Sequence, residues 1–325
     1  MRSKTKNNKS RNQIAAMTER AFDGLGLAPQ EDAVEELTDG WFNAVYLVRL
    51  ADGREAVLKI APPPDVEIMA YERNIMRTEV SAMRQVAKNP AIPVPEIYHF
   101  DTDHDLCDAE YFFMAKLAGE NYDQIKKALA PEVKAQIDRQ IGAIIREING
   151  FTGSYFGYDG NPHLRADTWK AAFIKIMESV LADGQRKNAD YGFGLEEIQD
   201  TYLQHTSALD AIALPRLVHW DGWNPNFFVQ DGQVSGLLDF ERALWADPLM
   251  EAQFRPLALG ELPESLRGYG KTTFTPEEDV RNHLYTLHLA LVMVTECTYR
   301  DYDTDGVRKF ALSLLKTTMN WFKPD

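Results

Sequence analysis

HWDGWNPNFFVQDGQVSGLLDFE, residues 219–241, is the stretch that decides the fold prediction. Asp221 stands five residues before Asn226, and an apolar run, an Asp-Gly turn and a second apolar run then lead to Asp239. The two runs predict a β-hairpin, whose tight turn can bring Asn226 and Asp239 to one edge. This spacing suits phosphoryl transfer, in which one carboxylate orients a hydroxyl nucleophile while an amide oxygen and a second carboxylate hold Mg²⁺ on nucleotide phosphates.

The chain before this stretch predicts a small sheet. Three short strands are expected within Val34–Ile60, and two more over Val94–Asp101 and Tyr111–Leu117, each bounded by turn residues or prolines. Helical patterns are expected from Gln13 to Leu25 and from Val66 to Lys88. We therefore expect an N-terminal lobe with a five-stranded antiparallel sheet and one long helix.

The chain after Gly119 is predominantly helical by pattern. Besides the hairpin strands at 227–230 and 234–238, it predicts helices over Pro131–Asn149, Trp169–Asp183, Leu195–Leu209, Pro276–Thr298 and Gly306–Phe322. The predicted fold class is α+β, a bilobal arrangement of a sheet lobe and a larger, mainly helical lobe. The predicted division is a flexible basic tail at 1–12, a nucleotide-binding lobe at 13–117, and a catalytic and substrate lobe at 118–325.

Two charged residues on apolar patterns are candidate phosphate-site residues. Lys59 lies in the apolar strand Ala56–Ile60, so its ammonium is expected to point into a cleft or an ion pair. Glu79 falls on the apolar stripe of the next helix, where a buried carboxylate needs a partner. A glutamate on the helix that pairs with a lysine on the strand would hold the lysine ammonium against the inner phosphates of a nucleotide. Glu72 shares the stripe and is the alternative to Glu79.

Two segments of the sheet lobe could contact a nucleotide through their backbone. Gly40 to Tyr46 is a turn between strands, where a flexible backbone can cover phosphates. Met114 to Gly119 is a short extended linker at the lobe boundary, whose backbone donors and acceptors could contact an adenine edge.

In this order, these motifs resemble the aminoglycoside phosphotransferase and choline kinase-like family, small-molecule relatives of the protein kinases. The resemblance covers about residues 33–255. The matching residues are Gly40, Asn43, Val45, Tyr46, Lys59, Pro93, Val94, Pro95, Met114, Gly119, His219, Asp221, Asn226, Asp239, Glu241, Asp247 and Pro248.

The resemblance implies roles for individual residues. Asp221 would be the catalytic aspartate, and Asn226 and Asp239 would hold Mg²⁺. Gly40, Asn43, Lys59 and Glu79 would serve the nucleotide phosphates, and the backbone of Ala115 and Leu117, beside Met114, would meet the purine of ATP or GTP. His219 would brace the catalytic loop, and Asp247 would cap or anchor the helix that follows.

The chain also departs from the family pattern. Many relatives have glycine at the position of Trp220 and histidine at the position of Trp223, so a role for that histidine is in doubt here. No activation segment of the protein-kinase type follows Asp239. A protein substrate is therefore less favoured than a small molecule with a hydroxyl group.

The charge and composition of the chain indicate which kinds of molecule it is expected to bind. The net charge is −14 over 325 residues, and without the five basic residues of the first twelve, 30 basic face 49 acidic residues. Such a body repels nucleic acid and anionic membrane and attracts cationic molecules. No apolar run reaches the roughly 20 residues that span a bilayer. Two separated cysteines, Cys107 and Cys297, indicate reduced thiols and a cytoplasmic protein.

The acceptor predicted from this charge is an aminoglycoside or another amino-bearing alcohol. The acidic cluster of Asp301, Asp303 and Asp305 is either an exposed turn or a carboxylate wall facing such a substrate. Macrolides, choline, homoserine and sugars remain as alternatives, and so does a kinase-like protein that binds nucleotide without catalysis.

Overall fold

The computed structural model describes residues 5–38, 40, 42–300, 302 and 305–323. Its contacts divide the chain into two units. The first consists of residues 1–67, 94–117 and 300–303, and the second of residues 68–93, 118–299 and 304–325. The chain passes from one unit to the other between Leu117 and Ala118, where the sequence predicts the lobe boundary. The predicted long helix after Val66 groups with the second unit.

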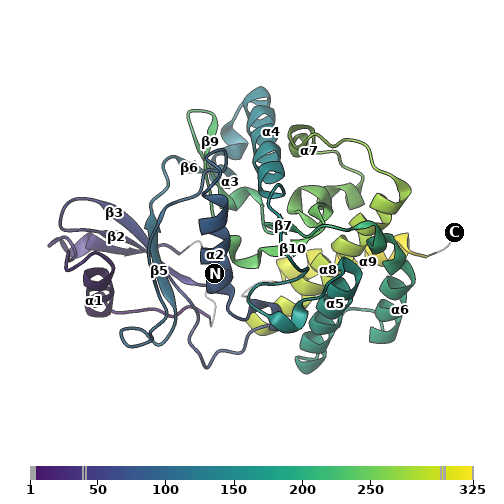
Figure 1. Cartoon of the computed structure of the whole chain (residues 1–325), viewed down its shortest axis with the longest axis horizontal. Coiled ribbons are helices and arrows are strands. Elements are labelled where there is room, and N and C mark those ends of the chain that lie inside the picture. The colour runs from purple at the N-terminus through teal and green to yellow at the C-terminus, as the bar shows by residue number, and fades with distance from the viewer. Residues whose placement is uncertain (1–4, 39, 41, 301, 303–304, 324–325) are drawn as a thin grey trace. The chain divides into compact units, whose positions relative to one another are not determined.

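The first unit is an antiparallel sheet with one helix (Figure 1). Its five strands are ordered β1-β2-β3-β5-β4. The elements are α1 (Arg11–Ala21), β1 (Val34–Glu36), β2 (Ala44–Arg49), β3 (Glu55–Ile60), β4 (Ile97–Asp101) and β5 (Tyr111–Ala115), with a 3₁₀ turn at Glu31–Ala33. All five predicted strands are present, although β4 begins three residues later than expected.

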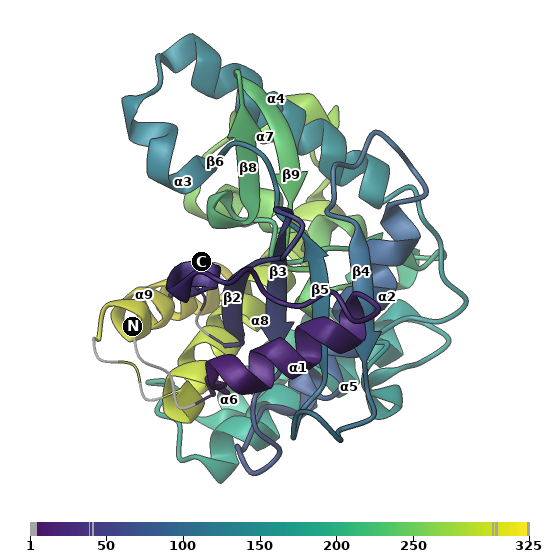
Figure 2. The same cartoon turned by 90° about the vertical axis from the view of Figure 1, so that its left-hand side faces the viewer.

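Helix α1 runs across one face of this sheet, as Figure 2 shows. Ile14 and Met17 of α1 are fully buried against Leu58, Ile60 and Phe113 of the sheet. Because strand side chains alternate between faces, Val57 and Lys59 of β3 point to the opposite face. The alternation of β3 therefore places the candidate lysine on the sheet face that α1 leaves uncovered.

The segment before α1 packs against the same unit. Thr5 and Asn7 are buried, and the Thr5 hydroxyl donates to the carbonyl of Phe42 at 2.7 Å. Lys9 makes an ion pair of 2.6 Å with Asp108 in the acidic loop between β4 and β5. The part of the predicted flexible tail from Thr5 onward is thus packed, because its polar groups find partners in two loops; residues 1–4 lie outside the described part of the chain.

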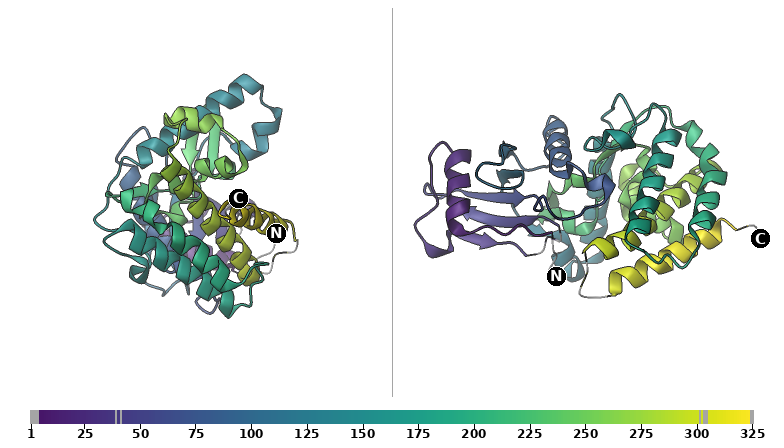
Figure 3. Two further views of the ribbon diagram at one scale, coloured as in Figure 1. Left: turned by 90° about the vertical axis from the view of Figure 1, so that its right-hand side faces the viewer. Right: turned by 90° about the horizontal axis from the view of Figure 1, so that it is seen from below.

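The second unit is mainly helical (Figure 3). Its helices are α2 (Ile75–Val86), α3 (Tyr122–Ile125), α4 (Pro131–Ile148), α5 (Trp169–Arg186), α6 (Leu195–His205), α7 (Glu264–Tyr269), α8 (Pro276–Arg300) and α9 (Gly306–Trp321). Its strands are β6 (Glu120–Asn121), β7 (Arg216–Val218), β8 (Phe227–Gln230), β9 (Gln233–Leu237) and β10 (Leu244–Ala246). The 3₁₀ turns are Ala70–Glu72, Lys126–Ala128, Pro162–Leu164, Thr206–Ala211, Asn224–Asn226, Phe240–Arg242, Pro248–Met250 and Ala252–Leu259. No helix in these described residues has the length and apolarity to cross a bilayer.

The helix predicted from Val66 to Lys88 begins only at Ile75. Asn74 has φ +52°, in the left-handed region, and its side-chain amide donates to the carbonyl of Gly160 at 2.9 Å. A left-handed residue cannot continue a right-handed helix, so the preceding turn stays separate. The prediction was wrong here because a tertiary hydrogen bond outweighs the apolar periodicity.

The predicted hairpin is present in the second unit, beside α4 (Figure 2). β8 pairs with β9 across Asp231 and Gly232, and β6 adds a third strand beside β8. Gly119, directly before β6, has φ +92°, and a Cβ there would lie 2.3 Å from the carbonyl oxygen of Val229. Only glycine fits this close approach, so the chain enters the second unit directly against the hairpin.

Candidate active site

The loop after β7 is held by one buried carboxylate, that of Glu251. The backbone N–H of His219 donates to Glu251 Oε1 at 2.9 Å, and that of Trp220 donates to Oε2 at 3.0 Å. Asn149, at the end of α4, donates its amide to Oε1 at 2.8 Å. Three donors on one fully buried carboxylate fix the loop just before Asp221. Glu251 lies on no apolar periodic pattern, so this anchor was not predicted.

Burial also affects the charge of this anchor. Burial raises the pKa of Glu251 to about 7, while the hydrogen bonds from His219, Asn149 and Trp220 and the charge of Arg255 lower it. A single carboxylate therefore changes its ionisation near neutral pH directly beneath the loop. Its two oxygens accept most strongly when it is ionised.

Asp221 and Asn226 are tied to each other within the loop. The Asn226 amide nitrogen donates to the backbone carbonyl of Asp221 at 2.7 Å. Because the amide nitrogen is used in this way, the side-chain oxygen of Asn226 is the atom suited to a cation. The backbone carbonyl of Asn226 accepts from the N–H of Leu238 at 2.9 Å, which joins the loop to the residue before Asp239. The side chain of Asp221 is 21% exposed and so keeps access to solvent.

Three carboxylates meet at the end of β9. Oxygen atoms of Glu79, Asp239 and Glu241 all lie within 4.8 Å of one another. Glu79 comes from α2, while Asp239 and Glu241 follow β9, and Asp239 takes φ +69° at the turn. Like charges this close repel unless a cation lies among them. The donor set, carboxylates with the Asn226 amide nearby in the loop, is of the kind that Mg²⁺ prefers.

The two candidate helix glutamates, Glu72 and Glu79, make different contacts. Glu72 uses Oε2 to accept from the N–H of Met69 at 2.8 Å, within its own 3₁₀ turn. Glu79 instead reaches the carboxylates after β9. Its predicted pairing with Lys59 joins residues of different units and stays a prediction.

His219 lies beneath the loop, in the bracing position that the resemblance implied. Its side chain is fully buried, and its Nε2 lies 2.9 Å from the carbonyl oxygen of Leu238, to which a ring N–H can donate. Its ring also packs 4.3 Å from that of Phe240. His219 thus connects the loop containing Asp221 with the turn containing Asp239.

A charged network that the sequence did not predict lies beside Asp221. Arg242 Nε is 3.9 Å from Asp221 Oδ2, and Arg242 Nη2 is 2.8 Å from Glu296 Oε1 in α8. The hydroxyl of Tyr71 also donates to Glu296 Oε1, at 2.5 Å. Burial opposes the charge of Arg242, but Glu296, Tyr71 and Asp221 raise its pKa well above the usual value, so it is a permanent cation.

Asp247, the predicted anchor, performs that role. It accepts from the N–H of Leu249 at 3.1 Å and so caps a 3₁₀ turn. Its other oxygen accepts from Arg281 at 2.8 Å and from Tyr285 at 2.7 Å, both in α8. The segment after β10 is therefore fixed to the long helix.

The remaining candidates lie in the first unit. Lys59 is 7% exposed and pairs in register with Val45 and Phe112, in the middle of the sheet. Met114 is buried on the same face as Val57, its register partner.

At the end of β5, the backbone N–H of Ala115 donates to the backbone carbonyl of Glu96 at 2.8 Å. A purine contact at this residue would therefore fall to its carbonyl, and a backbone donor would have to come from a residue such as Leu117, which is half-buried.

Gly40 and Asn43 lie before β2. A Cβ at Gly40 would lie 3.7 Å from its nearest neighbours, an ordinary contact, so packing within the unit does not demand glycine. Asn43 is buried. Asp301 and Asp303 lie outside the described residues, so the predicted carboxylate wall is not placed.

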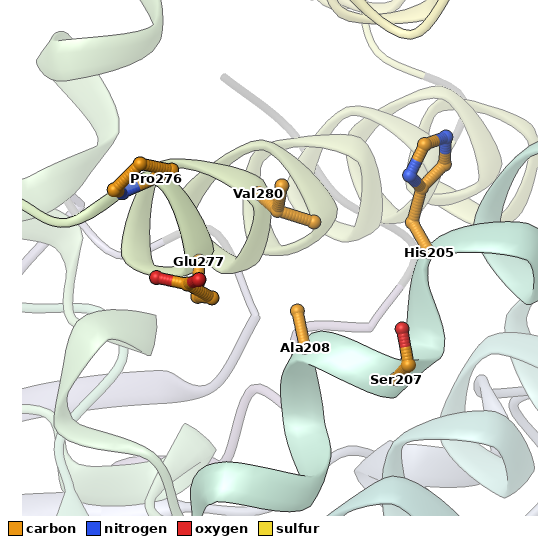
Figure 4. Close-up of a pocket in the computed structure, with 6 residues that line it drawn as sticks. All are labelled: His205, Ser207, Ala208, Pro276, Glu277 and Val280. Carbon is orange, nitrogen blue, oxygen red and sulfur yellow. The ribbon is translucent and has the colours of Figure 1, made fainter.

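One open cavity of about 300 Å³ lies elsewhere, at the start of α8 (Figure 4). It is lined by His205 at the end of α6 and by Ser207 and Ala208 of the following 3₁₀ turn, opposite Pro276, Glu277 and Val280. None of its lining residues belongs to the loop or the carboxylate cluster, so it is not the predicted site.

The comparison with known proteins decides the family. Residues 33–252, about two thirds of the chain, match the phosphotransferase enzyme family. The chain belongs to this family. Its motifs from Gly40 to Asp247 lie within the matched region.

Solved structures of phosphotransferases share its fold. The aminoglycoside phosphotransferase APH(4)-Ia, solved with ADP and hygromycin B, is similar over 95% of this chain and 98% of its own, at a TM-score of 0.65 and 16% identity. A proposed fructosamine-3-kinase from Thermobifida fusca is similar over 95% and 99%, at a TM-score of 0.65 and 20% identity. The family has the protein-kinase-like fold, so the predicted fold class is confirmed.

A curated relative matches only in part. A subtelomeric hrmA-associated cluster protein of Aspergillus fumigatus is 27% identical over 149 residues. The match spans 46% of this chain and 28% of that protein.

Proposed function

We propose that this phosphotransferase moves the terminal phosphate of ATP or GTP to a hydroxyl group of a small molecule. The observation that carries the proposal is the carboxylate cluster of Glu79, Asp239 and Glu241, joined through Leu238 to the loop that contains Asp221. Phosphoryl transfer needs this combination, a cation site beside a carboxylate that can orient a hydroxyl.

The cation site suits Mg²⁺. Asn226 and Asp239 are the proposed ligands, and Glu241 and Glu79 are close enough to Asp239 to complete the site or to orient its waters. Bound there, Mg²⁺ would neutralise charge on the nucleotide phosphates.

Asp221 would orient the acceptor. Its partly exposed carboxylate can accept the hydrogen bond of an incoming hydroxyl, which aims the oxygen at the terminal phosphorus. A loose transition state needs little proton removal before the phosphoryl group has moved, so an ordinary carboxylate is basic enough. Asn226 holds the backbone carbonyl of Asp221 and so limits rotation of the loop.

The first unit would supply the nucleotide site. Lys59, on the sheet face opposite α1, would contact the phosphates, and Gly40 and Asn43 would cover them. The Ala115 carbonyl and Leu117 backbone, beside Met114, would meet the purine. We propose residues 13–117 as the nucleotide-binding lobe and 118–325 as the catalytic and substrate lobe, with residues 68–93, which group with the second unit, contributing Glu79 to the cation site.

The proposed acceptor is an aminoglycoside or another amino-bearing alcohol. A net charge of −14 favours a cationic substrate. The similarity to a protein crystallised with hygromycin B and to a proposed fructosamine-3-kinase supports an amine-bearing sugar of this kind. Macrolides, choline, homoserine and neutral sugars are the alternatives to be tested beside it, and the cytoplasmic location remains a prediction.

The test is ADP release from Mg·ATP with hygromycin B, streptomycin, fructosyl-lysine, choline, homoserine, glucose and erythromycin as acceptors. We expect stimulation by at least one amine-bearing alcohol. Asp221→Asn should lower kcat at least about a hundredfold, some 2.7 kcal/mol of barrier, with nucleotide affinity kept. Asp231→Asn, at the exposed hairpin turn, is the matched control and should retain kcat.

Stimulation by neutral acceptors alone would remove the cationic substrate class. Full turnover by Asp221→Asn would contradict the role of that aspartate. Nucleotide binding without turnover on any acceptor would support the non-catalytic alternative.

A further inference from the structure

The residue before Asp221 has an unusual backbone for its type. Trp220 has φ +63°, in the left-handed region that glycine adopts freely and large side chains rarely adopt. Its N–H is held by Glu251, so the conformation is fixed from the backbone side. A strained residue at such a place calls for an account of what its side chain provides.

The indole of Trp220 is enclosed by three side chains. It is 3% exposed, with the ring of His288 5.0 Å away and the ring of Tyr71 edge-on at 6.0 Å. The guanidinium carbon of Arg242 lies 5.4 Å from the indole centroid, within cation–π range. The indole thus contacts one cation and two aromatic rings.

Of the side chains around the indole, Arg242 carries a positive charge, whereas His288 is neutral. Burial lowers the pKa of His288 to about 3, so its ring is neutral and does not repel Arg242. Tyr71 also lies within cation–π range of Arg242, at 5.8 Å. Trp220 and Tyr71 therefore offer two aromatic surfaces to one guanidinium.

Arg242 connects this aromatic surface to the reaction site. Glu296 pairs with its Nη2 at 2.8 Å, and Asp221 lies 3.9 Å from its Nε. The guanidinium is thus paired directly with Glu296, lies within cation–π range of two rings, and adjoins Asp221. A shift of the indole would move the cation that adjoins Asp221.

We propose that Trp220 is a positioning residue, whose indole holds the Arg242 guanidinium beside Asp221 and thereby sets the orientation of that carboxylate. The inference rests on the proposed role of Asp221. Glycine at this position would relieve the backbone but would leave Arg242 without its platform. The side chain therefore explains why the strained backbone carries tryptophan.

The experiment compares two substitutions of Trp220 in the full chain. Trp220→Phe keeps an aromatic face, and Trp220→Leu removes it while keeping apolar bulk. With Mg·ATP and hygromycin B, and with Mg·ATP and water as the acceptor, we expect Trp220→Leu to lower kcat about tenfold. The KM for ATP should change less than about twofold, and Trp220→Phe should restore kcat to within about threefold of the parent.

Two further variants separate positioning from general loss of packing. Trp245→Leu removes another buried indole, in β10, and should lower thermal stability while the folded fraction keeps its kcat. In an Arg242→Ala background, Trp220→Leu should cost less than about twofold, because the group that it positions is already gone.

The outcomes are distinguishable. An active parent whose kcat is unchanged by Trp220→Leu, or is lowered equally in both backgrounds, overturns this inference and leaves the proposed function in place. A parent without turnover dependent on Asp221, with water or with any acceptor of the panel above, overturns both.

Discussion

The loop of Asp221 and the loop before β2 have the same expected task, to hold a backbone against phosphates, but they are supported differently. In the second unit, the carboxylate of Glu251 accepts two successive backbone N–H groups from a fully buried position. In the first unit, the carbonyl of Phe42 accepts from the hydroxyl of Thr5, and the ring of Phe42 lies 4.8 Å from the guanidinium of Arg300.

The difference is one of strength. Charge-assisted hydrogen bonds in a buried site are about twice as strong as neutral ones, and a lost partner there leaves several groups unsatisfied. The hydrogen bond from Thr5 to Phe42 is a neutral one, so its loss costs less free energy than the loss of a bond to Glu251. We infer that Glu251 preorganises the catalytic loop, and that the bond from Thr5 supports the carbonyl of Phe42 more weakly.

The largest effect should follow removal of the buried anchor. Glu251→Ala leaves two backbone N–H groups and one of the two N–H bonds of the Asn149 amide without an acceptor, so we expect the free energy of unfolding to fall by roughly 4 kcal/mol. The folded fraction should lose at least about tenfold in kcat, because the loop of Asp221 is no longer fixed. Urea unfolding and ADP-release assays measure the two effects.

Glu261→Ala, at an exposed position, is the control and should change stability by less than about 0.5 kcal/mol. Parent-like stability of Glu251→Ala would mean that the catalytic loop needs no such anchor, and the contrast between the loops would disappear.

The pH dependence of stability should separate two buried groups of the second unit. Glu251 has a raised folded pKa of about 7, so the folded state binds its proton more tightly and this group's contribution falls as pH rises from about 4.5 to 7. His288 has a lowered folded pKa of about 3, so its contribution rises with pH up to about 6.5. The two slopes oppose each other between pH 5 and 6.5.

Each slope is at most about 1.4 kcal/mol per pH unit. Relative to the parent, Glu251→Gln should therefore gain stability with rising pH over this range, and His288→Phe should lose it. Denaturant midpoints measured at pH 5.0 and 6.5 are sufficient. Identical slopes in all three proteins would contradict the assigned ionisations.

The smallest effect is expected at the other loop. Thr5→Val removes the hydrogen bond to Phe42 while keeping the side-chain shape, which should cost about 1 kcal/mol and raise the KM for ATP two- to threefold. Its match is Thr18→Val, which removes a similar buried bond inside α1, to Ile14. We expect that variant to lose stability with the KM for ATP unchanged; equal KM values for both variants would show that Thr5 does not act through the loop.

Local patterns were enough to predict much of the fold. Alternation and turn residues predicted the five strands and the hairpin, because those signals lie within a few residues. The start of α2 was wrong because Asn74 bonds to Gly160, far along the chain. The short strands β6, β7 and β10 were not predicted, since two or three residues carry no period.

Sequence reasoning proposed only those residues of the candidate site that belong to a motif or to an apolar pattern. Asp221, Asn226 and Asp239 lie on one continuous stretch, and their spacing was visible. Glu251 binds backbone N–H groups, which almost every residue type has. No sequence motif therefore indicates its contact with the loop of Asp221. Glu296 reaches Arg242 from α8, a contact that only the folded chain creates.

The central claim is that Asp221 faces a nucleotide phosphate held by magnesium at the end of β9. A crystal structure with Mg²⁺ and AMP-PNP tests it most directly. We expect Mg²⁺ about 2.1 Å from oxygens of Asn226 and Asp239, with the terminal phosphate facing the carboxylate of Asp221. Nucleotide bound with no ion at Asp239, or with its terminal phosphate turned away from Asp221, would contradict the account.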